Sequence, residues 1–280
     1  MNTHTSRRHT VWLTLLLTVL AIIFLVPVIL VVLNSFKSRL YISSAPFSLP
    51  NGLTFVGLEN YLTGLKTAGF AAAFGRSLFI TVGAVLLIVF CTSMTAWYVV
   101  RVQSAWTRIL YYLFVFSMIV PFQMVMYTMT YVVGRIGFDT VPGIVIVYLG
   151  FGAGLSVFML CGFVRSIPLE IEEAATIDGC NPLQCFFRVV LPVMRPTAIT
   201  VAVLNAMWIW NDYLLPYLVL GTDQKTIPVA IQISMQGAYG ATDYGGLMAM
   251  LVLAIIPIIV FYLLAQKHII RGVIAGAVKG

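Results

Sequence analysis

Residues 165–196 read RSIPLEIEEAATIDGCNPLQCFFRVVLPVMRP, and they are the only long polar interval between two apolar runs in the second half of the chain. The interval holds four of the nine acidic residues and three arginines. The flanking sequence is strongly apolar, so a charged segment that can fold at this place is expected to bind something. We interpret it as a docking element for another protein.

The composition around this interval is that of a membrane protein. Of the 280 residues, 61% are hydrophobic and 9% are charged, whereas soluble domains have roughly 45–50% apolar and about 25% charged residues. The net charge of +7 comes from basic residues scattered beside apolar runs. They are therefore read as topology signals rather than as a nucleic-acid surface, and the expected surroundings are a lipid bilayer.

Six apolar runs each have about the 20 residues that a helix needs to cross the hydrocarbon. The first run is too long for a signal peptide and is expected to be retained. The predicted fold class is all-α integral membrane with six transmembrane helices, in a transmembrane domain over residues 11–266 between an N-terminus at 1–10 and a tail at 267–280. The expected spans are residues 11–33, 78–100, 109–133, 143–164, 197–220 and 247–266.

Lysines and arginines predict the orientation of these spans. If the N-terminus is cytoplasmic, the inner segments hold ten basic residues and the outer segments hold six. Basic residues are enriched in cytoplasmic loops. Both termini and the interval 165–196 are therefore expected in the cytoplasm.

The interval itself predicts a helix, a turn and a second helix. Ser166 can cap the first helix, whose early glutamates suit its positive end, and Gly179 is a candidate for a left-handed C-cap. Asn181 followed by Pro182 restarts a helix, which Pro192 and Pro196 are expected to break.

One face of the first helix should carry Ile167, Ile171, Ala174 and Asp178, because these residues are three or four positions apart. Small residues would let a partner approach closely, and carboxylates would attract a basic groove. A solvated loop helix without a partner is the alternative that this spacing leaves open.

The same interval resembles the EAA loop of ABC importer permeases. Glu173, Ala174 and Ala175 are followed by Asp178 and Gly179 at the spacing of that motif, and Val189, Leu191 and Pro192 continue it. The resemblance implies that these residues form a coupling helix, which in the family inserts into a cleft on a cytoplasmic ATPase subunit.

Nearly the whole chain resembles the permeases of carbohydrate importers, in particular the six-helix subunit of maltose-type systems. The matching stretches are NSFK at 34–37, LENY at 58–61, PFQ at 121–123 and WNDY at 210–213, with a tail containing Gly276, Lys279 and Gly280 that would contact the ATPase. Arg76 departs from the family, which often has asparagine there.

This resemblance implies a type I ABC importer in a bacterial inner membrane. The expected partners are a second permease subunit, two ATPase subunits and an extracytoplasmic solute-binding protein. ATP and Mg would be bound by the ATPase, and no cofactor by this chain. The implied solute is a sugar, and the alternatives are a sugar phosphate or a polyamine.

Residues for catalysis or for metal binding are not apparent in the sequence. The glycine and lysine spacing of a phosphate-binding loop is absent, and the three histidines lie near the termini. We therefore expect no enzyme and no metal site. A secondary transporter or channel is the alternative, and a proton-driven one should carry several acidic or histidine residues within its spans. Asp212 is the only acidic residue within a predicted span.

The fifth predicted span is the candidate solute path. Asn205, Trp208 and Asp212 are spaced three and four residues apart and should face one way, with Asn211 beside them. Polar groups facing lipid would cost several kcal/mol each, so this stripe should face protein or water and could bind sugar hydroxyls. The alternative is an interfacial tryptophan belt with asparagines bonding helix to helix.

Overall fold

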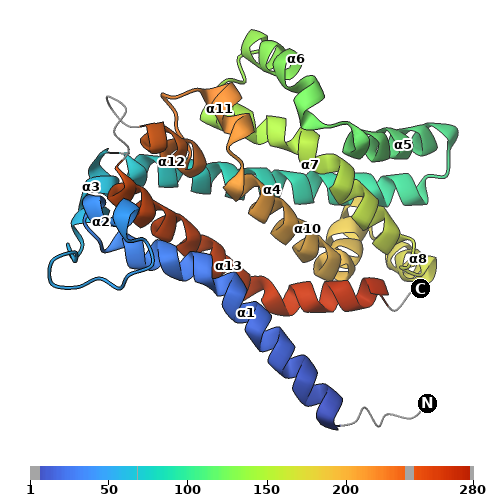
Figure 1. Ribbon diagram of the computed structural model, residues 1–280. Helices are drawn as coiled ribbons and strands as arrows, with labels where there is room; N and C mark the ends of the chain where they lie inside the picture. Colours follow the sequence, from blue (N-terminus) through green and yellow to red (C-terminus); the bar gives the residue numbers. More distant parts are fainter. Residues whose placement is uncertain (1–6, 68, 237–242, 278–280) are drawn as a thin grey trace. The chain divides into compact units, whose positions relative to one another are not determined.

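The computed structural model describes residues 7–67, 69–236 and 243–277, and the regular elements of this part are all helices (Figure 1). The all-α fold class is therefore confirmed. The chain divides into two compact units, which are treated separately below. Unit 1 comprises residues 1–70 and 230–257, and unit 2 comprises residues 71–229 and 258–280.

Five helical segments among the described residues are long and apolar enough to cross a membrane. They are Thr10–Ser35, Phe70–Arg101, Val141–Val164, Pro182–Asn211 and Tyr244–Gln266. A sixth span results if the bent pair of α5 and α6 is counted as one. The described part of the chain thus has five or six candidate spans, where the sequence predicts six.

The predicted span 109–133 is not one helix. It consists of α5 (Ala105–Ile119) and α6 (Phe122–Arg135), which meet at an angle of 107°. Pro121 is the N-cap of α6, and Val120 before it has φ −73° and ψ 115°. A residue that precedes proline is driven out of the helical region by the proline ring, so the chain turns at this point.

The predicted break at Pro192 and Pro196 is wrong. α9 (Pro182–Cys185), a π-helical turn (Phe186–Val190) and α10 (Leu191–Asn211) follow one another without interruption. Pro192 lies inside this run, directly after the π-helical turn, where the change from π to α hydrogen bonding accompanies its missing N–H. In the π turn before it, the N–H of Leu191 donates to the carbonyl of Phe186, five residues back.

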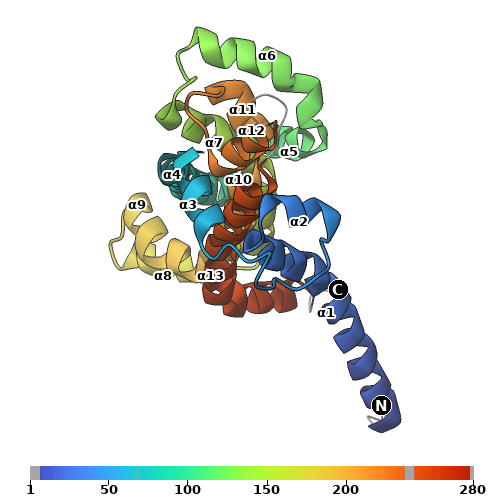
Figure 2. The same ribbon diagram turned by 60° about the vertical axis from the view of Figure 1, so that its left-hand side comes forward.

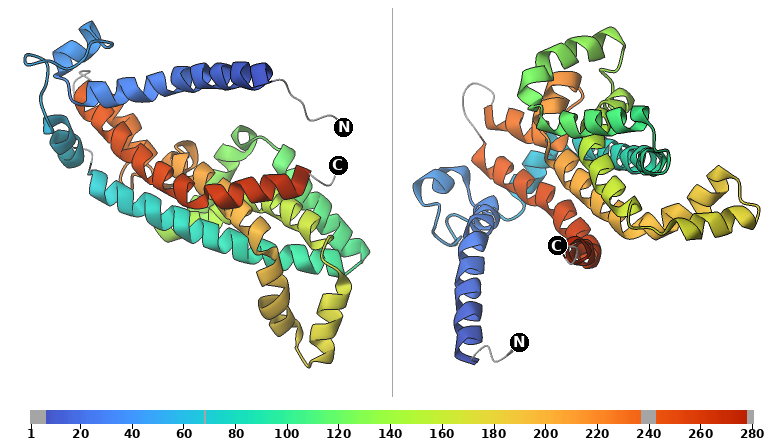
Figure 3. Two further views of the ribbon diagram at one scale, coloured as in Figure 1. Left: turned by 90° about the horizontal axis from the view of Figure 1, so that it is seen from below. Right: turned by 90° about the vertical axis from the view of Figure 1, so that its right-hand side faces the viewer.

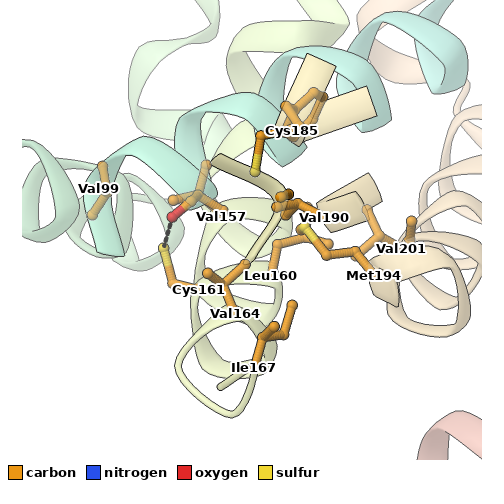
Figure 4. Close-up of a cluster of buried hydrophobic side chains, with 14 residues drawn as sticks. Val99, Val157, Leu160, Cys161, Val164, Ile167, Cys185, Val190, Met194 and Val201 are labelled. Carbon is orange, nitrogen blue, oxygen red and sulfur yellow. Dashed lines mark hydrogen bonds between the residues drawn. The ribbon is translucent and has the colours of Figure 1, made fainter. Parts of the chain in front are cut away.

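α7 (Val141–Val164) is the centre of unit 2 and packs against α5 and α10. A cluster of buried side chains from α4 (Phe70–Arg101), α7, the π turn and α10 fills the space between them (Figure 4). Gly154 lets α5 approach closely, because a Cβ there would lie 2.8 Å from the carbonyl oxygen of Phe114. This unit also contains α11 (Leu214–Leu220), the start of α12 (Ile227–Gln236) and the second part of α13 (Tyr244–Ala277).

Unit 1 contains α1 (Arg7–Ser35), α2 (Arg39–Ser44), α3 (Glu59–Thr67) and the first part of α13 (Tyr244–Ala277). Its loops are organised around Lys37, whose side chain is fully buried. The Lys37 ammonium donates to the carbonyl oxygens of Ala45 at 3.0 Å and Pro46 at 3.3 Å. Burial lowers the pKa of this ammonium.

Candidate functional site

The interval 165–196 contains a hairpin of α8 (Leu169–Ile177) and α9, which projects from one end of unit 2 (Figures 2 and 3). The predicted cap by Ser166 is wrong, because Pro168 occupies the N-cap of α8. The hydroxyl of Ser166 instead donates to the carbonyl oxygen of Phe163 at 2.7 Å. The first-turn glutamates Glu170 and Glu172 lie at the positive end of the helix, as expected.

The turn between α8 and α9 has the geometry that the sequence predicts. Gly179 has φ +85°, a left-handed conformation that favours glycine. Asn181 then caps α9: its side-chain oxygen accepts from the backbone N–H of Gln184 at 2.9 Å, and the Gln184 side chain accepts from the N–H of Asn181 at 3.0 Å. These local signals make the hairpin sharp.

The residues of the coupling motif divide between the two sides of α8. Glu173, Ala174, Asp178 and Gly179 are exposed, whereas Ala175 is buried. The predicted common face is only partly formed, because Ile167 precedes α8 and is buried in the hydrophobic cluster of unit 2. The outer side of the hairpin therefore carries two carboxylates and small residues.

Glu172 is a site residue whose partners sequence reasoning missed. The residue is buried, with 7% of its surface exposed, and both of its carboxylate oxygens are bonded to the end of α4. Trp97 Nε1 donates to Oε2 at 2.9 Å, and Arg101 donates to Oε1 from Nε at 2.9 Å and from Nη2 at 2.7 Å. Arg101 Nη2 also donates to the carbonyl oxygen of Ile167 at 3.0 Å.

This Trp97–Arg101–Glu172 clamp holds α8 to α4. Charge-assisted hydrogen bonds are about twice as strong as neutral ones, and the arginine makes two of them to one oxygen. No local signal in the sequence identifies these residues as partners, although two features describe their positions. Trp97 and Arg101 are four residues apart at the end of an apolar run, and Glu172 is three residues before Ala175, on the inner side of α8.

A cavity of about 660 Å³ lies beside the clamp, between the end of α4 and the α8–α9 hairpin. Its lining is largely apolar and includes Tyr98, Leu169, Ile177 and Cys180, with Glu173 at its edge. Ile177 is 85% exposed. A side chain from another molecule could therefore insert beside the exposed acidic side of α8.

The four residues of the predicted solute path do not form one open stripe. Asn205 is buried and donates to the Ser156 hydroxyl of α7 at 3.1 Å and to the carbonyl oxygen of Val201 at 2.9 Å. It thus bonds helix to helix, the alternative that the sequence left open. Asn211 is exposed and donates to the carbonyl oxygen of Met207 at 2.7 Å.

Asp212 lies just beyond the end of α10, so the predicted helical alignment with Asn205 and Trp208 stops before it. One of its carboxylate oxygens accepts from the backbone N–H of Leu214, the first residue of α11, at 3.0 Å. The other accepts from the hydroxyl of Tyr148 at 2.9 Å.

Tyr148 was not predicted as a site residue. It is fully buried in α7, and its ring meets the ring of Trp208 edge to face with centroids 5.5 Å apart. Trp208 itself is 42% exposed. Tyr148, Trp208 and Asp212 therefore form one aromatic and acidic group at the junction of α10 and α11.

Most of the predicted ATPase-contacting tail lies outside the described residues. Gly276 belongs to the last turns of α13, and Lys279 and Gly280 lie outside the described residues. Within residues 7–67, 69–236 and 243–277, no three His, Cys, Asp or Glu side chains gather as a possible metal site.

Comparison with known proteins identifies the family. The model of the binding-protein-dependent transport system inner membrane component matches residues 88–275. The probable starch degradation products transport system permease protein AmyC of Thermoanaerobacterium thermosulfurigenes is 40% identical, over 95% of this chain and 96% of that protein. The multiple sugar-binding transport system permease protein MsmG of Streptococcus mutans is 35% identical, over 96% of each chain.

A solved structure has the same fold. A chain of a bacterial ABC transporter involved in the import of the acidic polysaccharide alginate superposes with a TM-score of 0.77, at 23% identity, over 95% of this chain and 98% of that chain. The structural similarity and the family match agree on a helical permease architecture. The family match also identifies the chain as a transport subunit and not an enzyme. The protein belongs to the binding-protein-dependent transport system inner membrane components, and it is a multi-pass permease subunit of an ABC transporter.

Proposed function

We propose that this chain forms half of the transmembrane path of an ATP-driven importer for a sugar, which an extracytoplasmic binding protein delivers. The relatives AmyC and MsmG are named for starch degradation products and for multiple sugars, which supports a carbohydrate as the solute. The second half of the path comes from another permease subunit, and two ATPase subunits bind ATP and Mg. The assembly lies in a bacterial inner membrane with both termini of this chain in the cytoplasm.

The observation that carries this proposal is the α8–α9 hairpin. Its outer side is exposed and carries Glu173, Ala174, Asp178 and Gly179, while its inner side is bonded to α4 through Glu172. A protein that binds the outer side and moves would therefore displace α4 with α8. We infer that the ATPase is this protein, and that its closure on ATP is transmitted by this route.

The solute path of this subunit would include the group of Tyr148, Trp208 and Asp212. The half-buried Asp212 carboxylate can bond sugar hydroxyls, and the exposed Trp208 ring can stack on the apolar face of a sugar ring. The fully buried Tyr148 hydroxyl does not reach the sugar and instead holds the Asp212 carboxylate in place. Asn211, exposed one residue before Asp212, is a further candidate. Asn205 supports the path only indirectly, because its amide bonds α10 to α7.

Reconstitution in proteoliposomes tests the proposal. The full set of two permeases, two ATPase subunits and binding protein should import sugar with ATP inside the vesicle, and should not do so without the binding protein. The alternative of a secondary transporter expects the purified chain alone to move solute under an ion gradient. Uptake by the chain alone would overturn the proposal, and uptake of a sugar phosphate or polyamine in place of sugar would correct the solute class.

A further inference from the structure

A second cavity in unit 2 lies at the turn between α4 and α5, and it shares only Arg101 with the clamp of the proposed coupling. Its volume is about 570 Å³. Its lining combines three arginines with polar and aromatic side chains: Arg101, Arg108, Arg165, Ser104, Tyr111 and Tyr112. No acidic side chain is among its lining residues.

Two of the three arginines in this basic cavity keep an unneutralised charge. Arg101 is paired with Glu172 at 2.7 Å. Arg108 and Arg165 are both exposed, and neither has a carboxylate within 4.0 Å among the residues the structure describes. The Arg165 guanidinium is held over the ring of Tyr111 at 5.1 Å, which orients it without neutralising it.

Hydrogen bonds hold the turn between α4 and α5 beside the basic cavity. Ser104 caps α5 in a reciprocal capping box with Thr107, and Thr107 is buried. The hydroxyl of Thr107 also donates to the carbonyl oxygen of Val102 at 2.6 Å, which fixes the turn after α4. Arg101 and Arg108 thus flank a capped turn, and Arg165 joins them from the C-cap of α7.

An exposed apolar ridge of α5 runs away from the basic cavity. Trp106 and Tyr112 are each 62% exposed, Ile109 is 52% exposed and Phe116 is 62% exposed. Their spacing of three and four residues places them on one side of the helix. Tryptophan and tyrosine at the end of an apolar span lie at the level of lipid headgroups.

We propose that the basic cavity binds the phosphate of an anionic lipid headgroup, whose acyl chains lie along the apolar ridge of α5. Guanidinium groups bind phosphate oxygens in a bidentate manner. A soluble phosphate compound has the same charged group but no acyl chains to cover the apolar ridge. The exposed ridge therefore favours a lipid as the ligand. This site goes beyond the import function and does not depend on the identity of the solute or of the ATPase.

Native mass spectrometry of the purified full-length chain tests the lipid site. The chain is released from nanodiscs that contain equal amounts of phosphatidylcholine and phosphatidylglycerol, and the retained lipids are counted. The wild-type chain should retain phosphatidylglycerol preferentially. Because the loss of a hydrogen bond to a charged group weakens binding about tenfold, R108Q/R165Q should lose about 100-fold of that preference.

The control R135Q/R188Q removes the same charge outside the cavity and should keep the preference. Its Arg135 also lies over a tyrosine ring, that of Tyr131 at 5.2 Å, so it matches Arg165 in environment. A third variant, R108K/R165K, keeps the charge without the bidentate geometry and should retain an intermediate preference.

Two results would overturn the lipid site. One is equal phosphatidylglycerol retention by the wild-type chain and by R108Q/R165Q. The other is saturable binding of soluble glycerol 3-phosphate by a chain that shows no preference for phosphatidylglycerol over phosphatidylcholine, which would assign the cavity to a soluble phosphate compound.

Discussion

Removal of the Glu172 carboxylate by Glu172→Ala should free α8 from α4. The substitution abolishes three hydrogen bonds, from Trp97 Nε1 and from Arg101 Nε and Nη2. It leaves the Arg101 guanidinium with the carbonyl oxygen of Ile167 as its remaining partner at this site. The hairpin would then be held by its apolar contacts alone.

The size of this effect follows from the burial of the pair. Removal of one partner of a buried ion pair costs about 3–5 kcal/mol. The side chain of Arg101 is 19% exposed and that of Glu172 is 8% exposed, so water can partly solvate the arginine that remains. We therefore expect the lower end of this range, about 3 kcal/mol, which corresponds to roughly a hundredfold increase in local opening.

Amide hydrogen exchange of the chain in nanodiscs measures this opening. Peptides that cover α8 should exchange roughly a hundredfold faster in Glu172→Ala than in the wild type, whereas peptides from α7 should not change. The control is Glu173→Ala, which makes the same substitution at the next, exposed position of the same helix. Equal α8 exchange rates in the two variants would refute the clamp.

Three further predictions concern the turn, the solute path and the helix packing. Gly179→Ala places a side chain at φ +85°, which should cost about 1–2 kcal/mol and weaken the hairpin, as thermal unfolding of the purified chain would register. Asp212→Ala leaves the buried hydroxyl of Tyr148 without its carboxylate partner and should reduce sugar uptake. Asp139→Ala makes the same change in an exposed loop and should not reduce uptake. Wild-type rates of sugar uptake in both variants would remove Asp212 from the path. Gly152→Ala would bring a Cβ to 2.6 Å from the Ile88 side chain of α4. The melting temperature should therefore fall by an amount equivalent to about 1–3 kcal/mol. An unchanged melting temperature would contradict the tight packing of α7.

Local signals explain which parts of the hairpin were predictable from sequence. Gly179 and the pair Asn181–Pro182 act within a few residues of themselves, and the structure shows the left-handed turn and the cap that they predict. Ser166 was not informative, because a proline two residues later took the N-cap position. The predicted helix break at Pro192 and Pro196 was wrong, because both prolines lie inside a continuous helical run.

Contacts between distant segments were beyond sequence reasoning. The bonds of Glu172 to Trp97 and Arg101 join residues more than 70 positions apart, and nothing local specifies the partner. The same holds for Tyr148 and Asp212, which are 64 positions apart. Helical spacing also failed at Asp212, because α10 ends at Asn211 and the periodicity ends with it.

The measurement that tests the central claim most directly is the ratio of sugar imported to ATP hydrolysed by the complete reconstituted importer. Glu173→Lys reverses the charge on the exposed side of α8 without touching the clamp, and Asp139→Lys makes the same charge change on an exposed loop. We predict that Glu173→Lys loses sugar uptake while ATP hydrolysis continues, and that Asp139→Lys retains the wild-type ratio. A wild-type ratio in Glu173→Lys would contradict the role of the α8–α9 hairpin in coupling.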